Sequence, residues 1–163
     1  MQLTAPNLVE TIERVLTQTG LAPHRLELEI TERIFVEKSE ITLDKLRRLQ
    51  RLGIRISMDD FGTGYSSLSY LRSFPFNKIK VDRTFISDLE KGVAHLAIVQ
   101  AVISIARALG MTTTAEGVET AGQHEFLAAL GYDEAQGYFF SRPMPIDKVP
   151  DILAEWQKKA IAA

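Results

Sequence analysis

The sequence contains no cysteine. This excludes disulfide bonds, thiolate nucleophiles and zinc sites built on cysteine, and it fits a reducing compartment, so we expect a cytoplasmic location. The sequence also lacks any apolar run near the roughly 20 residues that a membrane-spanning helix needs, and its first residues lack a signal-peptide pattern. We therefore expect no membrane segment in this chain.

A marked excess of either charge is lacking as well. The 163 residues include 19 basic and 21 acidic side chains, with a formal net charge of -2. Such a chain has no general attraction to a nucleic-acid polymer or an anionic membrane, so a phosphate ligand must be held by a local site or by a metal. A composition of 45% hydrophobic and 25% charged residues fits one globular domain with a sizeable core.

The chain repeats one unit, in which a helix ends at a glycine and a short strand with a polar end follows. The residue patterns predict helices near 6–19, 39–52, 93–109, 120–131 and 146–156, and strands near 26–30, 54–59, 78–82, 111–116 and 134–138. Regular alternation of helices and strands favours a parallel sheet in an α/β protein. An open doubly wound sheet and a closed barrel both satisfy this order.

The polar faces of the strands favour the barrel. Strands of an open parallel sheet are apolar on both faces, whereas these strands carry polar side chains on one face, which a barrel would direct into its interior and toward its C-terminal rim. A complete barrel takes about 250 residues and eight strands. We therefore predict an incomplete TIM-type (β/α) barrel of about five parallel strands, lacking about three βα units at its front.

Two adjacent carboxylates, Asp59 and Asp60, end the strand at 54–59, and a glycine-rich loop follows them. Adjacent aspartates are more often turn residues or helix starts than metal ligands. The apolar run that leads into this pair favours the metal-ligand interpretation, because its alternation places Asp59 on the polar face of the strand. We interpret the pair as part of a metal site.

Further polar residues stand at corresponding strand ends, namely Glu29, Lys80, Glu116 and Gln136. With Asp59 and Asp60, the residues Glu29 and Glu116 make a set of four carboxylates. If these converge, they would repel one another strongly unless cations compensate their charge. Oxygen ligands without histidine or cysteine favour magnesium, manganese or calcium. Two metals that share a carboxylate would suit the cleavage of a phosphodiester.

The motifs at 29–32, 59–67, 78–82, 115–119 and 136–138 resemble, in order and spacing, those of the EAL-domain cyclic di-GMP phosphodiesterases. The resemblance covers nearly the whole chain. It implies a modified TIM barrel that hydrolyses one phosphodiester bond of cyclic di-GMP to give the linear dinucleotide. It also implies Mg²⁺ or Mn²⁺ as the cofactor and Ca²⁺ as an inhibitor.

The resemblance implies a role for each matching residue. Glu29 and Asp59 would bind the first metal, and Asp59 would bridge to a second metal bound by Asp60. Lys80 and Glu116 would be catalytic, with Lys80 orienting or stabilising the attacking water, and Gln136 would contact the substrate. The remaining assignments are Glu32 as the anchor of a gating loop and Phe61, Gly62, Thr63 and Gly64 as part of that loop, which would control metal binding and dimerisation.

Two metal ligands of the family have no counterpart. The sequence contains no Glu-Ala-Leu motif, and Asn7 and Asn77 do not match the family's asparagine ligand in context. We therefore interpret residues 1–163 as a single truncated EAL domain that lacks its N-terminal strands, and we predict that it is inactive or nearly so by itself. An open barrel edge also predicts self-association. A module that binds cyclic di-GMP without cleaving it, or one that binds another protein, remains the alternative.

Overall fold

The computed structural model describes residues 3, 5–31, 40–62, 71, 74–87, 89 and 93–161. Its strands are β1 (Glu27–Thr31), β2 (Arg55–Phe61), β3 (Lys78–Val81), β4 (Thr112–Glu116) and β5 (Glu134–Gln136). Its helices are α1 (Leu8–Thr19), α2 (Glu40–Arg51), α4 (Arg83–Ser87), α5 (Val93–Ala108), α6 (Ala121–Leu130) and α7 (Val149–Ile161), with 3₁₀ turns η1 (Pro23–Arg25) and η3 (Ile146–Lys148). The predicted alternation of helices and strands is confirmed.

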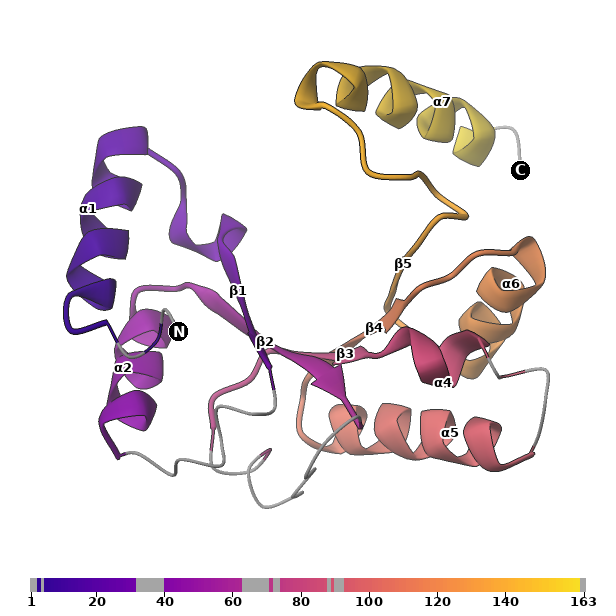
Figure 1. Cartoon of the computed structure of the whole chain (residues 1–163), viewed down its shortest axis with the longest axis horizontal. Coiled ribbons are helices and arrows are strands. Elements are labelled where there is room, and N and C mark those ends of the chain that lie inside the picture. The colour runs from indigo at the N-terminus through magenta and orange to yellow at the C-terminus, as the bar shows by residue number, and fades with distance from the viewer. Residues whose placement is uncertain are drawn as a thin grey trace.

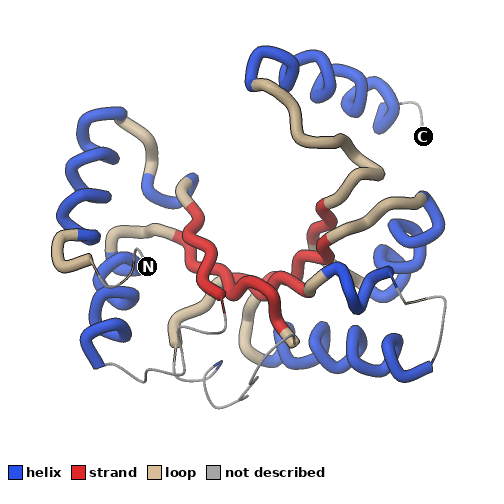
Figure 2. The backbone as a smooth tube through the Cα atoms, viewed as in Figure 1, coloured by secondary structure: helices blue, strands red, loops and turns tan. Residues whose placement is uncertain are grey.

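All pairings within the sheet are parallel, in the order β1-β2-β3-β4-β5. The strands form a curved row that does not close, and helices α2, α5 and α6 lie along its outer side (Figures 1 and 2). Within the described residues, β1 and β5 each pair on one side only. The prediction of an incomplete TIM-type barrel is confirmed.

The outer face of the sheet carries the hydrophobic core. Ile56, Met58 and Ile79 are at most 2% exposed and belong to one cluster with residues of α2 and α5, such as Leu46 and Val99. Burial of such side chains stabilises the fold by about 1.5–3 kcal/mol each. Because successive strand residues point to opposite faces, this packing directs the polar residues between them to the concave side.

Local signals place several helix ends where the sequence predicts them. Thr120 and Gln123 form a complete capping box at the start of α6, and Gly131 ends that helix in the left-handed conformation. At the other end of the chain, the Trp156 indole donates to the Phe140 carbonyl at 3.1 Å, which docks α7. No helix among the described residues has the length and apolar character needed to cross a membrane.

Several boundaries differ from the predicted ones by a few residues. Strand β2 continues to Phe61, two residues past the expected end, and β5 stops at Gln136 instead of Tyr138. The chain leaves the sheet after Gln136. Gly137 follows and packs so closely against the backbone of Val118 that no side chain fits there. The short helix α4 was not predicted, since its five residues are too few to show a helical period.

Candidate active site

Lys80 lies at the centre of a cluster of carboxylates on the concave face. Its Nζ is 2.7 Å from Glu29 Oε1, 3.0 Å from Asp59 Oδ1 and 2.7 Å from Glu116 Oε1. These partners come from β1, β2 and β4, so one side chain of β3 contacts three other strands. The structure thus brings together four of the residues that the sequence analysis assigned to one site.

The protonation states of the cluster depend on one another. Burial by itself would lower the pKa of Lys80, but hydrogen bonds to Glu116, Glu29 and Asp59 outweigh it and raise the pKa, so Lys80 stays charged at neutral pH. Burial raises the pKa of Glu116, and although Lys80 acts to lower it, the charges of Asp59 and Glu29 raise it further. One ammonium therefore compensates only part of the negative charge.

A bulge at the end of β2 turns two consecutive carboxylates toward one site. Met58 pairs with Ile79 and Phe61 with Val81, so β2 has one residue more than β3 between these pairs. Asp60 has a φ of 54°, in the left-handed region that aspartate tolerates better than most residues. In a regular strand Asp59 and Asp60 would point to opposite faces.

Asp59, Asp60 and Glu116 form a group that could hold a metal ion. One carboxylate oxygen of each lies within 4.8 Å of the others, and all three residues are half-buried. A set of carboxylate oxygens without nitrogen or sulfur fits Mg²⁺, Mn²⁺ or Ca²⁺. Glu29 belongs to the same cluster through Lys80 and is more open to solvent, with 51% of its side chain exposed.

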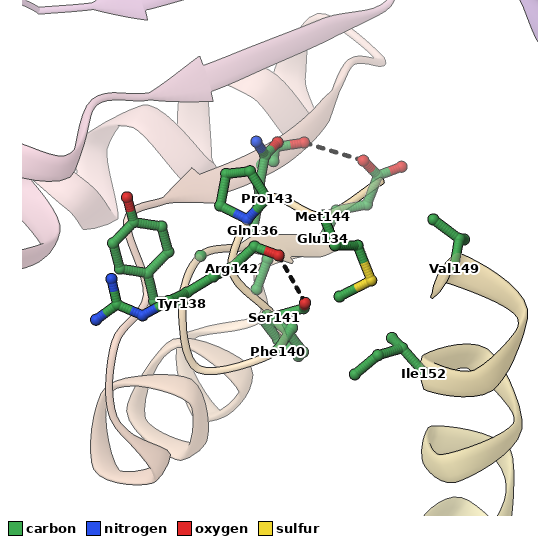
Figure 3. A pocket seen from close by; sticks show the side chains of 13 residues that line it. Glu134, Gln136, Tyr138, Phe140, Ser141, Arg142, Pro143, Met144, Val149 and Ile152 are labelled. Atoms are coloured by element: carbon green, nitrogen blue, oxygen red, sulfur yellow. Dashed lines mark hydrogen bonds between the residues drawn. The ribbon is translucent and has the colours of Figure 1, made fainter. Parts of the chain in front are cut away.

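Gln136 lies next to this group, because it pairs with Glu116 across β4 and β5. It also lines a pocket of about 640 Å³ between β5, residues 137–144 and α7. Figure 3 shows Val149 and Ile152 of α7 at one side of this pocket, with Gln136 and Tyr138 toward the other. The pocket is therefore bounded by an edge strand and by a helix that stands away from the sheet.

The gating-loop assignments fall mostly outside the described residues. Glu32, Thr63 and Gly64 are not among them. Phe61 is 8% exposed and ends β2 as part of the core. Gly62 follows with a φ of 96°, and a side chain there would meet the Phe85 ring at 2.8 Å.

Sequence reasoning assigned no role to a second charged group one layer below the cluster. Lys78 Nζ is 2.9 Å from Glu27 Oε2 and 2.7 Å from Glu134 Oε2. The spacing of Lys78 and Lys80, two residues apart on one strand, was the available signal, because it places both ammonium groups on the same face.

The chain matches the family model described as EAL domain over residues 1–143. It is 43% identical over 151 residues to the cyclic di-GMP phosphodiesterase NbdA of Pseudomonas aeruginosa, a match that covers 93% of this chain and 19% of NbdA. The chain spans about a fifth of the length of the curated relatives it matches.

Solved structures agree with this assignment. The structure of the PaMucR phosphodiesterase with cyclic di-GMP has a TM-score of 0.85 and 40% identity, with 91% of this chain and 60% of that chain covered. A structure of Klebsiella pneumoniae BlrP1 with manganese and cyclic di-GMP has a TM-score of 0.80 and 35% identity, with 87% and 36% covered. The sequence match and the fold lead to one conclusion, that the chain belongs to the EAL domain family.

Proposed function

We propose that this chain is a metal-dependent cyclic di-GMP phosphodiesterase module. The observation that carries the proposal is the group of Asp59, Asp60 and Glu116 beside Lys80. Cyclic di-GMP carries two phosphodiester charges, so a site rich in carboxylates would repel it unless cations lie between them. Two similar proteins support cyclic di-GMP as the substrate and a divalent cation as the cofactor. NbdA is a cyclic di-GMP phosphodiesterase, and BlrP1 has been solved in complex with manganese and cyclic di-GMP.

The carboxylates of this cluster are oxygen ligands of the kind that the two metal positions implied by the family resemblance require. Glu29 and Asp59 would hold one cation, while Asp59 and Asp60 would hold a second, with Glu116 beside them. When bound, the cations would neutralise the carboxylates and stabilise the attacking and leaving oxygens at phosphorus.

Lys80 would act as a charged hydrogen-bond donor rather than as a base. Hydrogen bonds to the surrounding carboxylates raise its pKa, so it is an ammonium that donates to them. It would instead orient the water whose oxygen bonds to phosphorus while one phosphorus–oxygen ester bond breaks and the leaving oxygen gains a proton. Gln136 would contact the substrate through its amide, which can both donate and accept hydrogen bonds.

We also propose that residues 1–163 form a truncated EAL domain whose metal site is incomplete. The open edges of β1 and β5 support this, as does the pocket between β5 and α7, where a further parallel strand could pair with β5. The Glu-Ala-Leu glutamate and the asparagine ligand of the family are absent from the sequence. The isolated chain is therefore expected to be inactive or nearly so.

Incubation of the chain with cyclic di-GMP and Mn²⁺, followed by chromatography of the linear dinucleotide, tests both proposals. Asp59→Asn is the control for a contaminating enzyme. Little or no product from the chain, and recovery of product when the upstream EAL strands are restored, is the expected result. Turnover near that of a complete EAL domain would contradict the truncation argument, and a restored domain that stays inactive would contradict the enzymatic one.

A module that binds cyclic di-GMP without cleaving it is the second candidate. The two absent ligands favour it. Calorimetry with cyclic di-GMP and Ca²⁺ distinguishes it from a protein-interaction module, because only a ligand-binding site would give a saturable heat that Asp59→Asn removes.

A further inference from the structure

Lys78 connects three alternate strands below the Lys80 cluster. Its ammonium contacts Glu27 of β1 at 2.9 Å and Glu134 of β5 at 2.7 Å, and the residue is 8% exposed. The interior of a (β/α) barrel is built from layers whose side chains come from alternate strands and are usually branched and apolar. Here the corresponding layer is charged and is held together by one lysine.

This layer lies directly before the site on four strands. Thr114 of β4 extends it, because its Oγ1 donates to Glu134 Oε2 at 3.0 Å. Each member precedes a residue of the site by two positions, in the pairs Glu27 and Glu29, Lys78 and Lys80, Thr114 and Glu116, and Glu134 and Gln136. A change in how these strands approach one another at this layer is therefore passed on to the site.

The contacts of Lys78 also reach both edges of the sheet. β1 and β5 have one neighbouring strand each within the described residues, so their distance across the concave face is not set by hydrogen bonding between them. Lys78 supplies that link, since Glu27 and Glu134 both contact its Nζ. Without the ammonium, two like charges would remain close together and would push the edges apart.

We propose that Lys78 is a positioning residue, which holds β1 and β5 at the separation that lets Glu29, Asp59, Asp60 and Glu116 bind divalent cations. This inference rests on the proposed function only for the identity of the ligand. Lys78 contacts none of these four carboxylates in the interactions found for the described residues.

The sign of the effect separates positioning from simple electrostatics. Removal of a positive charge near a cation site should strengthen cation binding if charge alone matters. Loss of a strand link should weaken it, because the ligands lose their geometry. Calorimetric titration of the chain and of Lys78→Met with Mn²⁺ is expected to show affinity at least tenfold lower for the variant, and equal or higher affinity would overturn the proposal.

Two further variants sharpen this test. Lys148→Met removes the same charge from an exposed position and should leave Mn²⁺ affinity unchanged. The double variant Lys78→Met and Glu134→Gln removes the link and the repulsion between Glu27 and Glu134 without changing the net charge, so it should fold even if Lys78→Met does not. Its Mn²⁺ affinity should stay low, and wild-type affinity in this double variant would contradict the role of the link.

Amide hydrogen exchange without metal keeps this inference separate from the proposed function. If the wild-type chain does not bind Mn²⁺, the proposed metal site fails, but the link can still be measured. Lys78→Met should then speed exchange in β1 and β5 at least tenfold and leave the amides of α5 unchanged. Exchange equal to wild type in both edge strands would refute the link itself.

Discussion

Lys80 and a metal ion would interact with the same carboxylates. Glu29, Asp59 and Glu116 all contact its ammonium, so in Lys80→Met their mutual repulsion would be uncompensated. Because Glu29 is half-exposed, we expect a loss of about 2 kcal/mol in the free energy of unfolding, below the range for fully buried pairs.

Mn²⁺ should then stabilise Lys80→Met more than the wild-type chain, since the cation replaces the missing charge. Melting temperatures measured with and without Mn²⁺ check this prediction. An equal Mn²⁺-induced shift in both proteins would mean that the cation does not bind to these carboxylates. The larger shift expected for Lys80→Met is the opposite of the effect expected for Lys78→Met, which should bind the metal more weakly.

Asp82 at the end of β3 provides a prediction about pH. Burial raises the pKa of Asp82, but hydrogen bonds from the Thr84 hydroxyl and amide at 2.6 and 3.0 Å outweigh it, so the pKa falls below the ordinary 3.8. A lowered pKa in the folded state gives stability that is present above pH 3.8 and lost as the pH falls through the folded pKa.

Asp82→Ala should therefore cost about 1 kcal/mol at pH 7, as is typical of a helix N-cap. The difference from wild type should shrink as the pH falls below 3.8. Urea unfolding of both proteins at several pH values measures it, with Asp147→Ala on an exposed turn as the control. A difference that is constant with pH would show that charge makes no contribution.

The bulge in β2 is the element on which the site most depends. Asp60 combines a carboxylate with a φ of 54°, and these two requirements can be separated by mutation. Asp60→Asn keeps a side chain that tolerates this conformation and should fold normally while binding Mn²⁺ much more weakly. Asp60→Val should also lose about 1–2 kcal/mol of stability, because a β-branched residue is strained there.

Denaturant unfolding and Mn²⁺ calorimetry on the two variants test this separation. The asparagine variant is the matched control for the backbone, because it changes the charge of the side chain but hardly its shape. If the Asp60→Val variant were as stable to denaturant as the Asp60→Asn variant, the left-handed conformation at residue 60 would have no energetic consequence.

The open edges of the sheet favour association of the whole molecule with other copies of itself. Unpaired strand edges and exposed apolar residues such as Leu153 of α7, which is 56% exposed, favour association with other chains. We therefore propose that the chain self-associates, with β5 and α7 as the contact region. Analytical ultracentrifugation over a range of concentrations should show species larger than a monomer.

Leu153→Lys offers a direct test of that region, because Leu153 is exposed and a charge there leaves the core intact. The variant should shift the population toward monomer, since it places a charge in the apolar contact region. Ala108→Lys, on the exposed side of α5, is the control and should leave the distribution unchanged. A monomeric wild-type chain at all concentrations would contradict this proposal.

The sequence alone predicted the order of the elements, the parallel sheet and the polar inner face. Alternation in a strand such as 78–81 is a local property that follows from backbone geometry, so it can be read without the fold. The positions of Glu29, Asp59, Lys80 and Glu116 at strand ends, together with the family motifs, predicted that these residues share one site.

Only the tertiary structure decided the features that depend on pairing between strands, namely the bulge in β2 and the contacts of Lys78. The bulge that turns Asp60 toward Asp59 exists only in register with β3, and the contacts of Lys78 with Glu27 and Glu134 require the curvature of the sheet. Residues 27, 78 and 134 lie far apart along the chain, and no local pattern relates them. The sequence thus determined which side chains face inward, whereas the register and the curvature of the sheet decided which of them meet.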